Sequence, residues 1–132
     1  MKFVTTDYTN KKTILKFPDH YVGVAVMVDA TNVAVNDEGK KILPAGTAVG
    51  GVNGSILTNA KHNKVEAKMT EGLSSGETGA AVDAEGVLLE DVDCTYGDAP
   101  GTMIIHGFLD LGKCKDIPEE ARDKMKLICF IE

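Results

Sequence analysis

The apolar residues of this chain come in short runs that are separated by turn residues. One run, YVGVAVMVDATNVAV at 21–35, is rich in β-branched side chains and partly alternates, and the turn-forming sequence NDEG follows at 36–39. Runs of this kind, bounded by Gly, Asn, Asp or Pro, are typical of strands. No run approaches the roughly 18 apolar residues that a membrane-spanning helix needs. The pattern therefore predicts strands joined by tight turns, and no membrane partner.

Two further segments carry hairpin signals. In ILPAGTAVGGVNGSILT at 42–58, the dipeptide Asn53-Gly54 lies between two apolar stretches, which predicts a type I′ hairpin turn. The runs Val82–Asp93 and Thr102–Leu111 are separated by the turn sequence TYGDAPG. We expect these last two runs to form paired central strands.

Only one helix is predicted, and it lies near the C-terminus. Asp116 can cap it, Pro118 suits its first turn, and acidic residues precede basic ones along it, which complements the helix dipole. Its expected length is about two to three turns. The final residues, LICFIE, predict a short strand that returns to the sheet. The expected fold class is mainly β (α+β): a small β-rich domain with one short C-terminal helix.

The first twenty residues differ from the rest. Isolated apolar side chains are mixed with Thr, Asn and Lys up to Pro18, and few of them follow a pattern that could fill a core. We therefore divide the chain into an extended N-terminal arm, 1–20, and a single β-rich domain, 21–132. Ordering an arm costs about 1 to 2 kcal/mol per residue. It must therefore pack on its own domain or be held by a partner.

Charge is distributed unevenly along the chain. Residues 1–68 hold nine Lys and six acids, residues 69–112 hold nine acids and no base, and residues 113–132 hold five of each. The net charge is −6 and Arg122 is the only arginine, which argues against nucleic-acid binding. Such asymmetry favours one surface that faces a partner, although acids scattered over strand edges would explain it equally well.

One acidic pattern suggests a metal site. Asp91-x-Asp93-x-Thr95, with Asp98 nearby, is similar to the start of a calcium loop. However, Tyr96 occupies the position of the sharp-turn Gly, and no Glu occupies the twelfth position. We therefore predict no metal.

The sequence contains no pattern typical of catalysis or cofactor binding. Cys94 or Cys114 could pair with His106 as nucleophile and base, but nothing marks an orienting third group, and His106 fits a half-buried strand residue. Together with Cys129, the chain has three cysteines, an odd number, and none of them forms a CxxC pair. This pattern indicates reduced thiols. The glycines at 46–54 form no phosphate-binding loop. The chain is therefore not expected to be an enzyme or to bind a cofactor.

Three segments resemble a known family. They are AEGVLLEDVDCTYGDAPGTMIIHGFLDL at 84–111, IPEEARDKMKLICFIE at 117–132 and ILPAGTAVGG at 42–51. The Gly-Val-Leu-Leu strand, the Asp-Val-Asp strand end, the Gly-Asp-Ala turn and the helix-then-strand ending are similar to those of the lambda-type head decoration (capsid-stabilising) proteins of tailed bacteriophages. The resemblance covers about half of the chain, and residues 1–35 and 52–80 do not add to it.

The resemblance implies a structural protein of the virion. Such a protein is made in the bacterial host cytoplasm, forms a homotrimer and binds the outer surface of the expanded capsid. Its partner is the major capsid protein, which it engages through the N-terminal arm, and the trimer cements capsomers against the pressure of packaged DNA. If the basic arm marks the capsid side, the acidic segment 69–112 should supply much of the solvent face.

Within such an arm, the backbone could add a strand to a sheet edge of the shell, and apolar side chains could fill pockets on alternate faces. Three arms on one trimer would raise avidity by about 10² to 10⁴ over one arm. The candidate capsid-binding residues are Lys2, Phe3, Val4, Tyr8, Lys11, Lys12 and Lys16.

Two alternatives remain open. A capsid-surface fibre or glycan-binding head protein would present exposed aromatics, and Tyr96 is the only tyrosine of the acidic segment. A small trimeric β-enzyme would need polar groups that converge at subunit boundaries, for which Asp91, Asp93 and His106 are the candidates.

Overall fold

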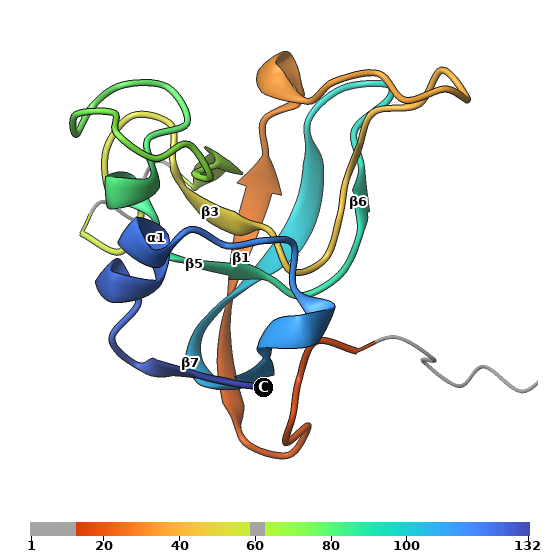
Figure 1. Ribbon diagram of the computed structural model, residues 1–132. Coiled ribbons are helices and arrows are strands. Elements are labelled where there is room, and N and C mark those ends of the chain that lie inside the picture. Colours follow the sequence, from red (N-terminus) through yellow and green to blue (C-terminus); the bar gives the residue numbers. More distant parts are fainter. Residues whose placement is uncertain (1–12, 59–62) are drawn as a thin grey trace, which may run out of the picture.

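The computed structural model of the chain describes residues 13–58 and 63–132 (Figure 1). The structure is 36% strand and 13% helical, which confirms the mainly β class with a single α-helix. The elements in chain order are β1 (Tyr21–Val28), η1 (Ala30–Asn32), β2 (Ile42–Leu43), β3 (Ala48–Gly51), β4 (Lys64–Ala67), η2 (Ala81–Asp83), β5 (Gly86–Leu88), β6 (Val92–Asp93), β7 (Ala99–Asp110), η3 (Leu111–Lys113), α1 (Glu119–Lys124) and β8 (Ile128–Ile131).

Five strands close into a ring. The main sheet runs in the order β1-β4-β3-β5-β7-β8, and β7 also pairs with β1. The β1–β7 pairing is antiparallel and extends from Tyr21↔Gly107 to Val28↔Ala99, with one irregularity near the start of β1. β8 pairs with β7 in parallel beyond the ring. The small β2–β6 pair forms a separate sheet.

The central strands are buried on both faces. Neighbouring residues of one strand belong to two different apolar clusters, as Val87 and Leu88 do in β5, and Met103 and Ile104 in β7. This follows from the two-residue period of a strand, which turns successive side chains to opposite faces. This explains why the sequence shows continuous apolar runs here. In a strand with one solvated face, apolar and polar residues would alternate.

The predicted pairing of the two central runs is confirmed, but their extent is not. β5 pairs with β7 at Val87↔Ile104 and Leu88↔Met103. The expected strand Val82–Asp93 is divided into η2, β5 and β6. The run at 21–35 also ends early, at Val28, because the Asp29 side chain accepts a hydrogen bond from the Thr31 amide and caps η1.

The expected two-residue hairpin at Asn53-Gly54 is wrong. A type I′ turn needs positive φ at both central residues, and only Gly54 has it, at 93°. β3 does pair with β4, but the chain continues in turns to residue 58 before it returns. The cause is tertiary: the carboxylate of Glu85 accepts hydrogen bonds from the backbone amides of Ile56 and Leu57 and draws this segment towards it.

The C-terminal helix is shorter than predicted. It covers Glu119–Lys124, and Pro118 occupies its N-cap position without a side-chain cap. A residue that precedes proline is driven towards extended backbone, so Ile117 cannot be helical and Asp116 lies too far upstream to cap. After the helix, Ile128–Ile131 returns to the sheet beside β7, as the sequence predicts.

The expected arm overlaps the packed domain. Ile14 is 2% and Leu15 8% exposed, and both belong to the apolar cluster that α1 covers. Leu15 lies opposite Leu109 of β7 in an antiparallel bridge. The segment 1–20 therefore contributes two core residues. Their burial could not be predicted, because two apolar residues without periodicity do not indicate a buried element.

This overlap yields a stability prediction. Ile14→Ala should lower the free energy of unfolding by about 2–5 kcal/mol, because it leaves a cavity in the core. Lys16→Ala, at an exposed position two residues along, should change it by at most about 0.5 kcal/mol. Urea unfolding followed by circular dichroism measures both. A protein lacking residues 2–16 should be at least as unstable as the Ile14 variant, and full stability of that truncation would contradict the assignment.

Candidate functional site

The arm is fixed to the domain at its base. The Lys16 amide donates to the Phe108 carbonyl at 2.9 Å, and the Asp110 amide donates to the Ile14 carbonyl at 2.7 Å. The Lys16 side chain is exposed. The other predicted capsid-binding residues lie outside the described residues, so their role stays a prediction: Lys2, Phe3, Val4, Tyr8, Lys11 and Lys12.

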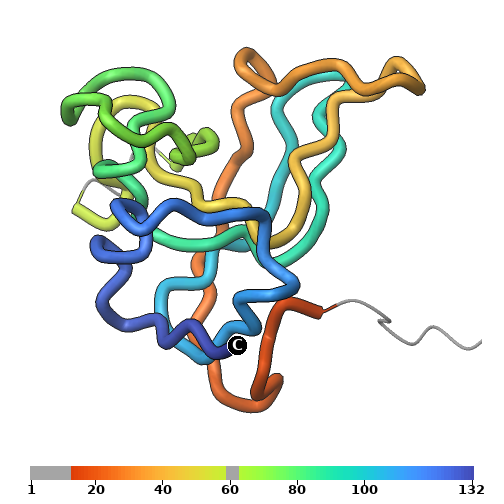
Figure 2. The backbone as a smooth tube through the Cα atoms, viewed as in Figure 1, coloured from red at the N-terminus to blue at the C-terminus, as the bar shows by residue number. Residues whose placement is uncertain are grey.

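The base of the arm lies against the end of β7. Leu109 is fully buried, with Leu15 opposite it on one edge of β7 and Phe130 of β8 on the other. Figure 2 shows the first described residues beside the C-terminal end of the chain. Because three segments pair here, the position and direction in which residue 13 meets the domain are well defined.

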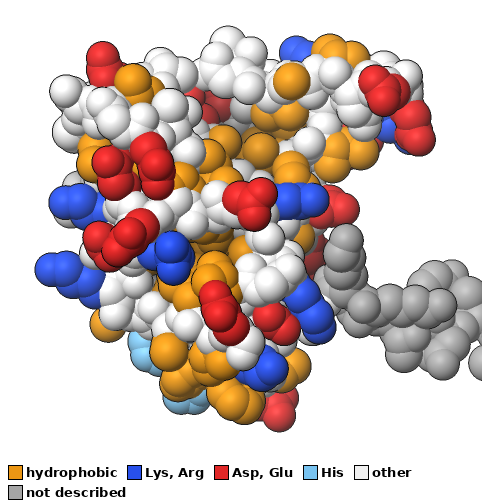
Figure 3. All heavy atoms as spheres, in the orientation of Figure 1, with side chains coloured by type: hydrophobic (Ala, Val, Ile, Leu, Met, Phe, Trp, Pro, Cys, Tyr) orange, Lys and Arg blue, Asp and Glu red, His pale blue; other side chains and the backbone are white. Residues whose placement is uncertain are grey.

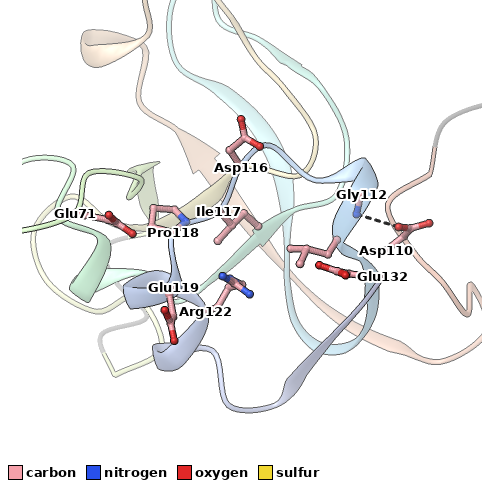
Figure 4. A pocket seen from close by; sticks show the side chains of 10 residues that line it. Glu71, Asp110, Gly112, Asp116, Ile117, Pro118, Glu119, Arg122 and Glu132 are labelled. Atoms are coloured by element: carbon pink, nitrogen blue, oxygen red, sulfur yellow. Dashed lines mark hydrogen bonds between the residues drawn. The ribbon is translucent and has the colours of Figure 1, made fainter.

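An acidic hollow of about 680 Å³ opens near this base, between η3, α1 and the C-terminus (Figure 4). Arg122 lies in it, and its Nε is buried without a hydrogen-bond partner among the described residues. The Asp110 carboxylate accepts from the Gly112 amide and caps η3. The excess of carboxylates makes this an unfavourable site for anions such as nucleotides. The acidic residues that line it are Glu71, Asp110, Asp116, Glu119 and Glu132.

Two other acids hold loops of their own chain. The Glu85 carboxylate accepts from Ser55 Oγ at 2.8 Å and from the Gly51 amide at 2.9 Å, in addition to the amides named above. The Asp83 carboxylate accepts from Ser75 Oγ and the Gly76 amide. Within segment 69–112, which is expected to supply much of the solvent face, these two carboxylates are half-buried. Their function is to order the loops around them.

A buried ion pair lies at the end of β4, between Glu66 of the strand and Lys68 just beyond it, and was not anticipated from the sequence. Lys68 Nζ and Glu66 Oε1 are 2.8 Å apart, and their side chains are 3% and 5% exposed. Asn32 donates to the second Glu66 oxygen at 2.9 Å, and Gly79 from the Gly-Ser loop approaches at 3.4 Å. The only signal was the alternation of charged residues with Val65 and Ala67, which a solvent-exposed strand face would show equally well.

The acidic residues of the calcium-like pattern do not converge on one point. Asp91, Asp93 and Asp98 each accept hydrogen bonds from different parts of the chain. Lys64 lies 2.8 Å from Asp98, and this contact is the main cause that lowers the pKa of the Asp98 carboxyl. Within residues 13–58 and 63–132, no group of three or more His, Cys, Asp or Glu side chains is arranged to hold a metal.

The thiols of Cys94 and Cys114 are not activated. Cys94 is buried among apolar residues, and burial raises its pKa. Burial likewise raises the pKa of the Cys114 thiol to about 11, and a thiol that stays protonated is a poor nucleophile. His106 is half-buried, as predicted, and its ring packs against His20 with 5.4 Å between centroids.

The candidate residues of the enzyme alternative are separated within one chain. Asp93 ends β6, just before the turn that leads into β7, whereas His106 lies near the far end of β7. The two residues therefore lie towards opposite ends of the twelve-residue strand β7.

No family model, curated protein or solved structure matches this chain. Over the part of the chain that the structure describes, no helix has the length and apolar character to cross a membrane. The resemblance to decoration proteins therefore rests on the three sequence segments quoted above.

The Asp83 contacts predict a dependence of stability on pH. Hydrogen bonds, from Ser75 above all, lower the pKa of Asp83 in the folded protein. Because the pKa of Asp83 is lower in the folded than in the unfolded protein, its carboxylate stabilises the fold at pH values above the unfolded pKa of about 3.9. This stabilisation is lost as the pH falls through the pKa of the folded protein. Asp83→Asn should therefore lower the melting temperature at neutral pH and reduce its decline below about pH 4. Glu71→Gln, at an exposed carboxylate, is the control. Identical pH profiles for wild type and Asp83→Asn would contradict this role.

Proposed function

We propose that this chain is a phage head decoration protein that binds the outer capsid surface as a trimer and cements capsomers against internal DNA pressure. The observation that carries the proposal is the fixed base of the arm. Ile14 and Leu15 are buried in the domain, and backbone hydrogen bonds join residues 14 and 16 to β7. A tether between a shell and a decorating domain needs such a junction.

The junction suits the transmission of force. A pull on the arm acts on the antiparallel contact with β7, and β7 pairs in turn with β1, β5 and β8. The load therefore spreads over the whole ring and does not act on one loop. In this proposal the basic residues Lys11 and Lys12 precede the junction, and Phe3, Val4 and Tyr8 supply the side chains that fit shell pockets.

Attachment depends on three arms acting together. A single strand addition by a short segment is weak, but two further arms on the same trimer bind at a high effective concentration, which raises avidity by about 10² to 10⁴. Shell expansion would then set the spacing at which all three arms engage. This accounts for decoration of the mature shell without a separate signal.

The test uses expanded shells that lack the protein. The full chain should saturate them and retain DNA on heating, whereas a protein lacking residues 2–12 should lose at least about 100-fold in affinity, because each arm is removed. Tyr8→Ala, within the arm, should weaken binding, and Tyr96→Ala, the same change at a fully exposed site on the domain, should not. Equal occupancy by the truncated protein, or equal DNA retention with and without the protein, would refute the cementing function.

A second candidate function, glycan binding by a head fibre, is favoured by one observation. Tyr96 is 101% exposed in the turn between β6 and β7, beyond any apolar contact that would explain it. An exposed ring of this kind can stack on a sugar face.

A glycan array tests this second candidate with the same variant. Under it, the full chain should bind a carbohydrate and Tyr96→Ala should lose that binding while its occupancy of shells is unchanged. Absence of binding to any glycan by the full chain, or binding that Tyr96→Ala retains, would contradict this candidate.

A further inference from the structure

Three side chains of complementary chemistry meet where β4 ends. Figure 3 shows charged side chains spread over the outer surface of one face of the molecule, with apolar side chains in the recess between its two upper lobes. Lys68 and Glu66 depart from this distribution, because their side chains are only 3% and 5% exposed. The Glu66 carboxylate contacts Lys68 Nζ at 2.8 Å through one oxygen and accepts from Asn32 Nδ2 at 2.9 Å through the other. An amine, a carboxylate and a carboxamide therefore lie in direct sequence.

The Lys68 side chain has a defined course over β3. Its backbone amide donates to the Ala48 carbonyl at 2.8 Å. Gly50 lies opposite Glu66 in the register of β3 and β4, and a Cβ at Gly50 would lie 3.1 Å from Lys68 Cγ. The absence of a side chain at Gly50 leaves room for the lysine stem, which places the amine against Glu66.

Asn32 reaches the same carboxylate from the neighbouring strand. It is the last residue of η1, which follows β1, and β1 pairs with β4 in parallel. The Asp29 amide donates to the Val65 carbonyl at 2.9 Å, which holds the start of η1 beside β4. Asn32 itself is exposed, so a small molecule released from its side chain enters solvent directly.

The environment of Lys68 suits a nucleophile. Within the described residues, Nζ makes one hydrogen bond, to Glu66, although an ammonium has three protons to donate. A buried charge that is incompletely bonded is costly, and so is a buried carboxylate. Transfer of one proton along the 2.8 Å contact leaves a neutral amine and a neutral acid. A base within hydrogen-bond distance is the usual means by which a side chain is activated as a nucleophile.

We propose that Lys68 and Asn32 become joined by an isopeptide bond, with Glu66 as the catalytic acid and base. After Glu66 takes a proton from Nζ, the amine attacks Asn32 Cγ, and an Nζ–Cγ bond forms. Glu66 delivers that proton to Nδ2 and takes the second proton from Nζ, the Cγ–Nδ2 bond breaks, and ammonia leaves. The proton that remains on Glu66 passes to the ammonia as ammonium, which restores the carboxylate. The reaction needs no oxidant, cofactor or second substrate.

Proximity compensates for the low reactivity of an amide. Two groups held together in one molecule react as if at effective concentrations of up to about 10⁵–10⁸ M, provided that they are well oriented. The fold supplies this arrangement by pairing β1 with β4. The product would tie the residue after β1 to the end of β4 and close residues 32–68 into a covalent ring, which restricts the unfolded chain.

Mass spectrometry of the intact protein tests the bond. The wild type should weigh less than its sequence by one molecule of ammonia. Glu66→Gln and Lys68→Met should each keep the full mass of their sequences, because the first lacks the base and the second lacks the nucleophile. Lys64→Met is the matched control: it makes the same change at an exposed lysine of the same strand and should still lose ammonia.

Digestion with trypsin locates the bond. Trypsin does not cleave after a lysine whose amine is acylated. A bond at Lys68 should therefore yield a branched peptide in which residues 65–113 are attached to residues 17–40. Without the bond, the digest contains 65–68 and 69–113 as separate peptides.

Two results would overturn the proposal. One is a folded wild type that keeps its full sequence mass on prolonged incubation. The other is a loss of ammonia that persists in Lys68→Met, which would assign the loss to a different reaction. Circular dichroism of Glu66→Gln and Lys68→Met excludes misfolding as the reason for a missing bond, and the branched peptide of the wild type depends on neither variant. The bond lies within the domain, so its absence leaves the arm-dependent attachment untouched.

Discussion

The pairing of β1 with β7 is the contact on which the remaining structure depends. It joins the first strand of the domain to the longest one and closes the five-stranded ring. Closure gives each strand an inner and an outer face, and in the central strands β5 and β7 both faces are apolar, so the chain builds two clusters around one thin sheet. α1, η2 and the base of the arm cover the outer cluster. The end of β7 that extends beyond the ring then pairs with β8 and with residue 15.

Local sequence patterns predicted the elements that local forces determine. The apolar runs predicted the paired central strands, and the residues after the helix predicted the last strand. In both cases the burial of apolar residues determines the strand. Two of the failures occur where a distant group overrides a local preference. Glu85 turns an Asn-Gly hairpin into a longer loop, and Ile14 and Leu15 enter the core through pairing with a strand about 95 residues away, close to Leu109.

The candidate surfaces were predictable to different degrees. Lys16 could be assigned to the basic N-terminal segment from composition alone, and its side chain is exposed in the structure. The rings that pack together at Phe17, His20, His106 and Phe108 come from two separate segments, 17–20 and 106–108, and no periodicity links them. The contacts of Asp83 and Glu85 could not be predicted, for a related reason. A count of charges cannot distinguish a carboxylate that faces water from one that receives backbone amides.

The buried pair of Glu66 and Lys68 has a consequence for the folding of β4. A buried ion pair adds little net stability, because desolvation offsets the attraction. It does, however, make a shifted pairing of β4 with its neighbouring strands unfavourable. If β4 slipped by one residue, both charges would turn towards the apolar interior of the ring, and Val65 and Ala67 would face the polar cover formed by Asn32 and Gly79. The pair thus helps to fix the register of this four-residue strand, together with Val65 and Ala67, which the same slip would turn out of the apolar interior.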